Sequence, residues 1–178
     1  MAIGLVGSEM CIRDRQRAAD VGVPAELITA ARAVNRTMPI HVAGVLNELL
    51  YKAGVPAGEG KVLLLGWSYK AEVGDPRETP AEPLTEALHS KDIAVAAYDP
   101  HLNAEDFPEG VEVVSDIGSA EGYDLAVLVT AHKACQEIDW TSLASRMRNP
   151  ILYDGRRVLD LASIESSGWQ VHAVGKPQ

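Results

Sequence analysis

Two groups of basic side chains, far apart in the sequence, each follow a short apolar run. Lys70 and Arg77 follow one run, and Arg156 and Arg157 follow another. A helix start just beyond the first group would add backbone N–H donors, which favour anions. The 16 basic and 25 acidic residues give a formal net charge of −9. In such a chain, two converging cationic loops suit a small ligand with several negative charges, such as a diphosphate. Either group alone would be read as surface cations on a solvated loop.

Other motifs for phosphate or metal chemistry are incomplete. The first apolar run ends in one glycine, Gly66, whereas a dinucleotide-binding fingerprint needs three in the pattern Gly-x-Gly-x-x-Gly. Residues 54–61 superficially suggest a P-loop, but their glycine spacing is off by one and they precede a strand. His132 and Cys135 lie three residues apart without a second pair, so we expect no zinc site.

The composition is that of an ordinary soluble globule of about one domain. Of the 178 residues, 47% are apolar and 23% are charged. No apolar run approaches the ~18 residues of a membrane span, and the acidic balance argues against nucleic acid as a partner. The two cysteines, Cys11 and Cys135, are too few for a disulfide framework. This fits a reducing cytosol and predicts a cytoplasmic protein.

Apolar runs alternate with helical patterns from residue 61 onward. The runs expected to form strands are 61–66, 93–98, 111–114, 125–130, 151–153 and about 170–174. One helix should begin at Thr79, with Pro80 in its first turn and Glu82 completing a capping box, and another should span about 140–147. This alternation predicts an α/β fold whose mostly parallel sheet has helices on both faces.

Ligands of parallel sheets bind beyond the carboxyl ends of the strands. The loops in which a site is expected are therefore 66–77, 98–102, 130–133 and 154–157. The basic groups described above lie in the first and the last of these loops.

A long helical arm is expected before the sheet, over residues 16–52. Apolar residues recur at three- and four-residue spacing on both sides of Pro39. Because proline lacks an N–H, Pro39 should kink or restart the helix. The arm could pack on another domain or subunit, or it could be a helix of the same core.

The first fifteen residues differ in origin from the rest, on our interpretation. Residues 5–14 read as the in-frame translation of a transposase-type sequencing-library adapter. We therefore expect residues 1–15 to be an assembly scar, and the gene to be truncated upstream of Gln16. Cys11 then takes no part in any chemistry. The alternative is a genuine but unusual N-terminus.

Five short motifs occur in order along the remaining chain. They are Val34-Asn35-x-x-Met38-Pro39, Leu64-Leu65-Gly66-x-x-Tyr69-Lys70, Asp75-x-Arg77-Glu78-x-Pro80, Tyr98-Asp99-Pro100 and Asp154-Gly155-Arg156. With them, the chain from about Gln16 onward resembles the C-terminal part of the UDP-glucose / UDP-N-acetylhexosamine 6-dehydrogenase family, UDP-N-acetylmannosamine-like members included. The resemblance implies that residues 16–55 end a central helical dimerisation region. Residues 56–178 would form a Rossmann-like C-terminal UDP-binding domain.

The resemblance also implies roles for individual side chains. Tyr69, Lys70 and Arg156 stand where the family contacts the UDP-sugar. Arg77 stands where an arginine reaches NAD across the domain cleft. These assignments agree with the charge pattern. The aspartates of the motifs are short polar residues suited to turns, and we expect them to shape loops.

Members of this family oxidise a UDP-hexose to a UDP-uronate in a four-electron reaction with NAD and a cysteine nucleophile. Neither that cysteine segment nor a Gly-rich NAD loop occurs here, and Cys135 is read as a packing residue. The implied function is the UDP-sugar-binding portion of an NAD-dependent nucleotide-sugar 6-dehydrogenase of polysaccharide biosynthesis, inactive alone. NAD would be bound mainly by the missing N-terminal domain, and the full-length protein would be a homodimer.

Two alternatives to this function remain open. The first is a stand-alone, non-catalytic nucleotide- or nucleotide-sugar-binding module. The second is a fragment of an ordinary one-hydride dehydrogenase, which fits Asp154-Gly155-Arg156 poorly.

Overall fold

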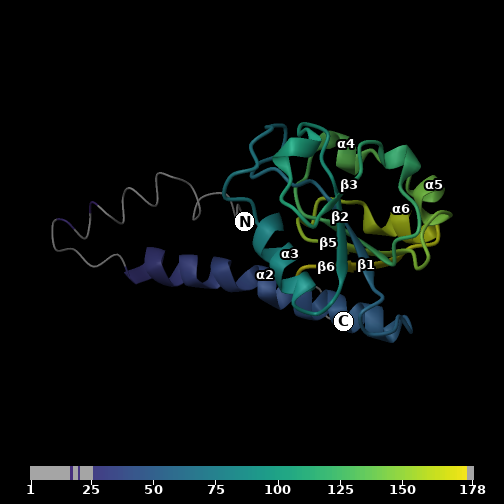
Figure 1. The fold of residues 1–178 in the computed structure, drawn as a ribbon, viewed down its shortest axis with the longest axis horizontal. Helices are drawn as coiled ribbons and strands as arrows, with labels where there is room; N and C mark the ends of the chain where they lie inside the picture. Colours follow the sequence, from purple (N-terminus) through teal and green to yellow (C-terminus); the bar gives the residue numbers. More distant parts are fainter. Residues whose placement is uncertain (1–16, 18–19, 21–25, 176–178) are drawn as a thin grey trace. The chain divides into compact units, whose positions relative to one another are not determined.

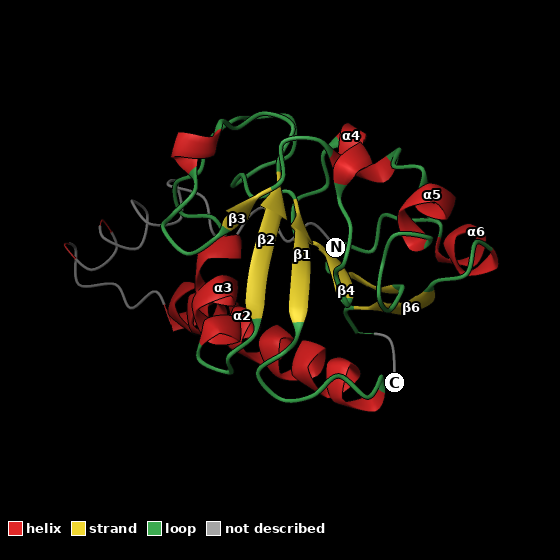
Figure 2. Cartoon of the chain, turned by 45° about the vertical axis from the view of Figure 1, so that its right-hand side comes forward, coloured by secondary structure: helices red, strands yellow, loops and turns green. Residues whose placement is uncertain are grey.

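A parallel sheet is the centre of the fold in the computed structural model, which describes Arg17, Asp20 and residues 26–175. Its strands are β1 (Lys61–Leu65), β2 (Ala94–Tyr98), β3 (Glu112–Val113), β4 (Leu125–Leu128), β5 (Ile151–Asp154) and β6 (Gln170–Ala173). They lie in the order β3-β2-β1-β4-β5-β6, and all neighbouring pairs are parallel (Figure 2). This is the strand order of a doubly wound Rossmann fold. The predicted α/β class is thereby confirmed.

Both faces of the sheet are covered, because successive side chains of a strand enter two different hydrophobic cores. Val62 and Leu64 of β1 belong to one core, and Leu63 and Leu65 to the other. Helix α3 (Ala81–His89) and the second half of α2 (Glu26–Lys52) close the first core. The second core is closed by α4 (Lys133–Gln136), α5 (Trp140–Ala144) and α6 (Leu161–Ser166). Burial on both sides explains why β1 has no polar alternation.

The expected arm is helix α2, which continues through Pro39 (Figure 1). Of the two expected effects of Pro39, a kink or a restart, the restart is wrong, because one helix spans the proline. A proline inside a helix removes one N–H donor, and the ladder resumes in the next turn. In the part of the chain that the structure describes, no helix has the length and apolar character needed to cross a membrane.

The chain divides into two units, and the division falls inside α2. The first unit is Met1–His41 and the second is Val42–Gln178. In the first unit, the apolar side chains of Leu27, Val34 and Ile40 are exposed. In the second unit, the continuing helix buries its own apolar side chains, namely Ala43, Leu46, Leu49 and Leu50. Residues 1–15, the predicted scar, lie outside the described residues.

The short helices differ from expectation in their details. Pro80 is the N-cap residue of α3 rather than its first residue, and no capping box forms with Glu82. The Thr79 hydroxyl instead accepts a hydrogen bond from the Ala81 amide at 3.1 Å and donates to the Trp67 carbonyl. Helix α6 was not predicted, because its short sequence contributes a single buried side chain, Ile164, to the core.

Candidate functional site

The loops that follow β1, β2, β4 and β5 all leave the same edge of the sheet, because all four strands are parallel (Figure 2). These are the loops in which the sequence predicted a site. They bring together residues that are 60 or more positions apart in the sequence. Glu72 and Ser68 of the β1 loop form hydrogen bonds with His132 and Thr130 of the β4 loop.

The buried carboxylate of Asp99, just after β2, ties three of these loops together. Its Oδ2 atom accepts hydrogen bonds from the backbone amides of Trp67 and Ser68 at 2.7 Å each and from the Ser68 hydroxyl at 2.8 Å. His132 lies 3.0 Å away through Nε2, and the His101 amide donates to Oδ1 at 2.9 Å. Burial alone would raise the pKa of Asp99, but these donors outweigh it and hold the pKa well below its usual range.

A second buried carboxylate, Asp154 at the end of β5, shapes the loop that carries the second basic group. Its Oδ1 atom accepts the amides of Arg156 and Arg157 at 2.8 and 2.7 Å. Its Oδ2 atom accepts the amides of Val158 and Leu159 at 3.0 Å each. Four consecutive N–H groups therefore wrap one side chain. The expectation that these aspartates shape loops fits this geometry.

Two glycines allow the loops to pack directly on the end of β4. A Cβ atom on Gly66, whose φ is +84°, would clash with the Thr130 carbonyl oxygen. A Cβ atom on Gly155 would lie 2.7 Å from the Leu128 carbonyl oxygen. The Thr130 hydroxyl also donates to the Ser68 carbonyl at 2.6 Å. The β1 and β5 loops are thus fixed against the β4 loop from its two sides.

The sequence-predicted contact residues lie on these two loops. Tyr69 and Lys70 are exposed on the β1 loop. Arg77 is on the same loop, where its guanidinium forms two hydrogen bonds to Asp75 at 2.9 and 2.7 Å. These bonds lower the pKa of Asp75 to about 2. Arg156 is on the β5 loop, so the loops with the two basic groups flank the end of β4.

The Arg156 side chain is the most constrained of these cations. It is half-buried, and its Nε atom donates to the Val129 carbonyl at 2.5 Å. Burial lowers the pKa of the Arg156 guanidinium, and the nearby Asp154 carboxylate opposes that effect. An arginine remains charged under these conditions, so the site holds a partly desolvated positive charge with fixed direction.

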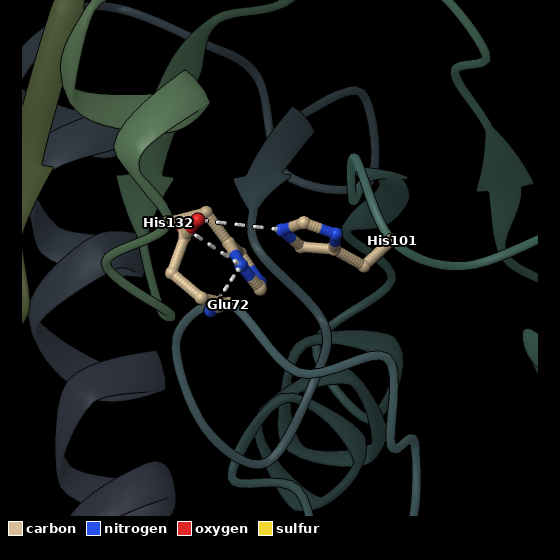
Figure 3. Close-up of side chains that lie close together, drawn as sticks. All are labelled: Glu72, His101 and His132. Carbon is tan, nitrogen blue, oxygen red and sulfur yellow. Dashed lines mark hydrogen bonds and ion pairs between the residues drawn. The ribbon is translucent and has the colours of Figure 1, made fainter.

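Three residues that the sequence did not connect meet between the β1, β2 and β4 loops (Figure 3). The Glu72 amide donates to Nδ1 of His132 at 3.0 Å, and the Glu72 carboxylate accepts the Lys133 amide at 2.7 Å. The same carboxylate lies 3.8 Å from Nε2 of His101 and 3.9 Å from Nδ1 of His132. The hydrogen bond from Lys133 is the main cause that lowers the pKa of Glu72. No local pattern could have revealed this contact, because it depends on how three loops converge.

The ligand-type atoms of Glu72, His101 and His132 lie within 4.8 Å of one another, which raises the question of a metal. The His132 ring has no lone pair to give, however. Its Nδ1 atom accepts the Glu72 amide, and its Nε2 atom faces the Asp99 carboxylate. A metal ion would have to displace the Glu72 amide. The geometry is that of a hydrogen-bonded contact between the β1 and β4 loops.

The described residues do not form a dinucleotide site of the Rossmann type either. Such sites need a Gly-rich turn after the first strand and a free acidic residue near the end of the second, which binds the ribose. Here Gly66 is packed against Thr130, and Asp99 has donors on both of its oxygens. NAD therefore does not fit this edge of the sheet in the way a Rossmann domain binds it.

A family model now identifies the domain. The model for the UDP binding domain of the UDP-glucose/GDP-mannose dehydrogenase family matches residues 63–161, more than half of the chain. The chain belongs to this family. Tyr69, Lys70, Arg77 and Arg156 all lie within the matched UDP binding domain.

Individual relatives within the dehydrogenase family agree with this assignment. The UDP-N-acetyl-D-mannosamine dehydrogenase of Pyrococcus horikoshii is 33% identical over 133 residues, which are 75% of this chain and 30% of that protein. The UDP-glucose 6-dehydrogenase TuaD of Bacillus subtilis is 27% identical over 166 residues, 91% of this chain and 35% of that protein. The chain thus spans about a third of the length of these curated relatives.

Solved structures of dehydrogenases share the fold. The UDP-D-ManNAc dehydrogenase of Pyrococcus horikoshii matches with a TM-score of 0.72 at 29% identity, over 89% of this chain and 35% of that one. The NDP-N-acetyl-D-galactosaminuronic acid dehydrogenase of Methanosarcina mazei Go1 matches with a TM-score of 0.75 at 25% identity, over 90% of this chain and 36% of that one.

Proposed function

We propose that this chain is the UDP-sugar-binding part of an NAD-dependent nucleotide-sugar 6-dehydrogenase that acts in the cytoplasm, in polysaccharide biosynthesis. The observation on which the proposal rests is the match of residues 63–161 to the family's UDP binding domain. The chemistry of the carboxyl edge supports it, because Lys70 and Arg156 bring positive charge to two loops of a chain whose net charge is −9.

The contact that each side chain would make with the ligand follows from how the loop positions that side chain. Arg156, whose direction is fixed by the Val129 carbonyl, would bind the diphosphate through its remaining N–H donors. Lys70, exposed on the β1 loop, would add a second positive charge, and Tyr69 beside it would supply a ring and a hydroxyl for contact with the nucleotide-sugar. Arg77 would contact NAD.

The oxidation itself would need groups outside the described residues. The described cysteine, Cys135, is buried in the second core, and burial raises its pKa to about 12, so it is no nucleophile. We infer that the nucleophilic cysteine and the NAD-binding domain belong to a longer protein, of which residues 16–55 are the end of a dimerisation region and residues 56–178 are the UDP-binding domain. That protein would be a homodimer. The sequence of the genomic DNA upstream of codon 16 distinguishes this from a stand-alone binding module.

Isothermal titration calorimetry of the 178-residue chain with UDP tests the proposal. We expect binding, with Lys70→Ala and Arg156→Ala each weakening it by at least about tenfold, since each removes a charge-assisted contact worth about 1.5–3 kcal/mol. Lys91→Ala is the matched control, because Lys91 is an exposed lysine just before β2, at the opposite edge of the sheet. A folded wild-type chain that binds no UDP would overturn the proposal.

A further inference from the structure

The β1 loop is anchored at its start and again at its middle, on either side of Lys70. At the start, the amides of Trp67 and Ser68 donate to Asp99. At the middle, Glu72 makes its two hydrogen bonds, from its amide to His132 and from Lys133 to its carboxylate. Lys70 is therefore two residues from an anchor in each direction.

The two anchors are connected through His132, whose ring contacts Asp99 on one side and the Glu72 amide on the other. These two contacts fix the tautomer of His132. Because the Asp99 carboxylate can only accept, the proton must be on Nε2 of His132. Because the Glu72 amide can only donate, Nδ1 must carry the lone pair. The ring is fully buried and lies against the His101 ring, with the ring centroids 4.9 Å apart and the ring planes tilted by 51°. His132 thus transmits the position of Asp99 to the middle of the loop.

The backbone of Glu72 is also unusual for a residue with a side chain. Its φ is +61°, in the left-handed region that disfavours residues other than glycine. In this conformation, both its amide and its carboxylate reach the β4 loop. A further backbone hydrogen bond, from the Tyr69 amide to the Asp75 carbonyl at 2.8 Å, closes the base of the loop. Strain of this kind persists where surrounding contacts impose it.

We propose that Glu72 and His132 are positioning residues that hold the β1 loop so that Tyr69 and Lys70 meet the UDP-sugar in a fixed arrangement. This inference rests on the proposed function, in which those two residues contact the ligand. A loop without its middle anchor would have to be ordered when the ligand binds, and that ordering weakens affinity. The proposal therefore assigns a role in binding to two residues that do not touch the ligand.

Paired substitutions at His132 separate positioning from general structural loss. In His132→Asn, the side-chain oxygen can still accept the Glu72 amide, as Nδ1 does. In His132→Phe, no acceptor remains. Both variants lose the hydrogen bond between Nε2 and Asp99, so the difference between them is the acceptor for the Glu72 amide. We expect His132→Phe to bind UDP at least about tenfold more weakly than the wild-type chain, and His132→Asn to stay within about threefold of it. Calorimetry measures both values.

Glu72 provides a second pair at an exposed position. Glu72→Gln keeps an acceptor for the Lys133 amide, whereas Glu72→Ala removes it. We expect Glu72→Ala to weaken UDP binding by about tenfold and Glu72→Gln to leave it within about threefold. Because Glu72 is exposed, both variants should fold, so this pair decides the question even if His132→Phe does not fold.

Limited trypsin digestion gives a local readout of the loop. Release of the loop should speed cleavage after Lys70, identified by mass spectrometry, in His132→Phe and Glu72→Ala but not in His132→Asn or Glu72→Gln. His89→Asn, at the exposed end of α3, is the control. If the wild-type chain binds UDP and both His132→Phe and Glu72→Ala bind it equally well, the positioning role is refuted while the proposed function stands. If the wild-type chain binds no UDP, both fail.

Discussion

The carboxylate of Asp99 accepts hydrogen bonds from residues that follow three different strands. Trp67 and Ser68 follow β1, His101 follows β2, and His132 follows β4. Because its oxygens receive charge-assisted hydrogen bonds away from water, the charged form of Asp99 is favoured in the folded state. The stability of the loops at this edge should therefore depend on the ionisation of one side chain.

The free energy of unfolding should fall as the pH drops below about 4. A carboxyl group whose pKa is lowered on folding stabilises the fold above its unfolded pKa, which for Asp99 is the ordinary aspartate value of 3.8. That stabilisation is lost as the pH falls toward the lowered pKa. Asp99→Asn should cost about 3 kcal/mol at neutral pH and make the pH dependence shallower. Urea unfolding at neutral pH and near pH 3 measures both effects.

Comparing the acid sensitivity of the Asp99→Asn chain with that of the wild-type chain isolates the contribution of Asp99 from that of the other acidic groups. Asp75, whose pKa is lowered to about 2 by Arg77, titrates in both chains and cancels. Asp92→Asn is the control, because Asp92 is exposed and its φ of +58° suits asparagine. An Asp99→Asn chain with the same acid sensitivity as the wild-type chain would contradict the assignment.

At the scale of elements, the position of the β1 loop depends on how closely its backbone passes the end of β4. The contact between Gly66 and Thr130 leaves no room for a Cβ atom, and the backbone of Gly66 is left-handed. A side chain there would push the connection between β1 and α3 away from β4. Every residue of the first basic group lies on that connection, so the site and the packing of the sheet are linked through one glycine.

Gly66→Ala should therefore destabilise the chain by more than the conformational cost alone. Gly122 is the matched position, since its φ of +76° is similar and a Cβ atom added there would have no other atom within 4 Å. We expect Gly122→Ala to cost about 1 kcal/mol and Gly66→Ala about 3 kcal/mol or more, because only the second adds a clash with backbone. Chemical unfolding curves of the two variants give the difference. If both variants lost the same free energy of unfolding, the contact between residue 66 and Thr130 would adjust to the added Cβ atom without cost.

At the scale of the whole molecule, the sequence revealed the sheet better than the site. The strands were predictable because buried parallel strands such as β1 are unbroken apolar runs, and the edge was predictable because ligands bind beyond such strands. The loop-shaping roles of Asp99 and Asp154 followed from residue type. The contact between Glu72 and His132 was not predictable, because the two residues are 60 positions apart and meet only through the docking of two loops.

The division of the chain inside α2 leads to a prediction about which part folds independently. Both hydrophobic cores are built from residues after His41, and the apolar residues of α2 that enter the first core lie between Ala43 and Leu50. A chain that starts at Met38 keeps all of them and leaves Pro39 in the first helical turn, where proline is tolerated. It should unfold at a temperature within a few degrees of the 178-residue chain and bind UDP equally well.

A chain that starts at Ala53 is the matched comparison, because it loses the buried side chains of Ala43, Leu46, Leu49 and Leu50. Each buried leucine contributes about 1.5–3 kcal/mol, so their combined loss approaches the whole stability of a typical domain. We expect this chain to be largely unfolded by circular dichroism. If it stayed folded, α2 would be an appendage of the sheet. Unfolding of the Met38 chain would instead show that residues before Met38 contribute to the stability of the fold.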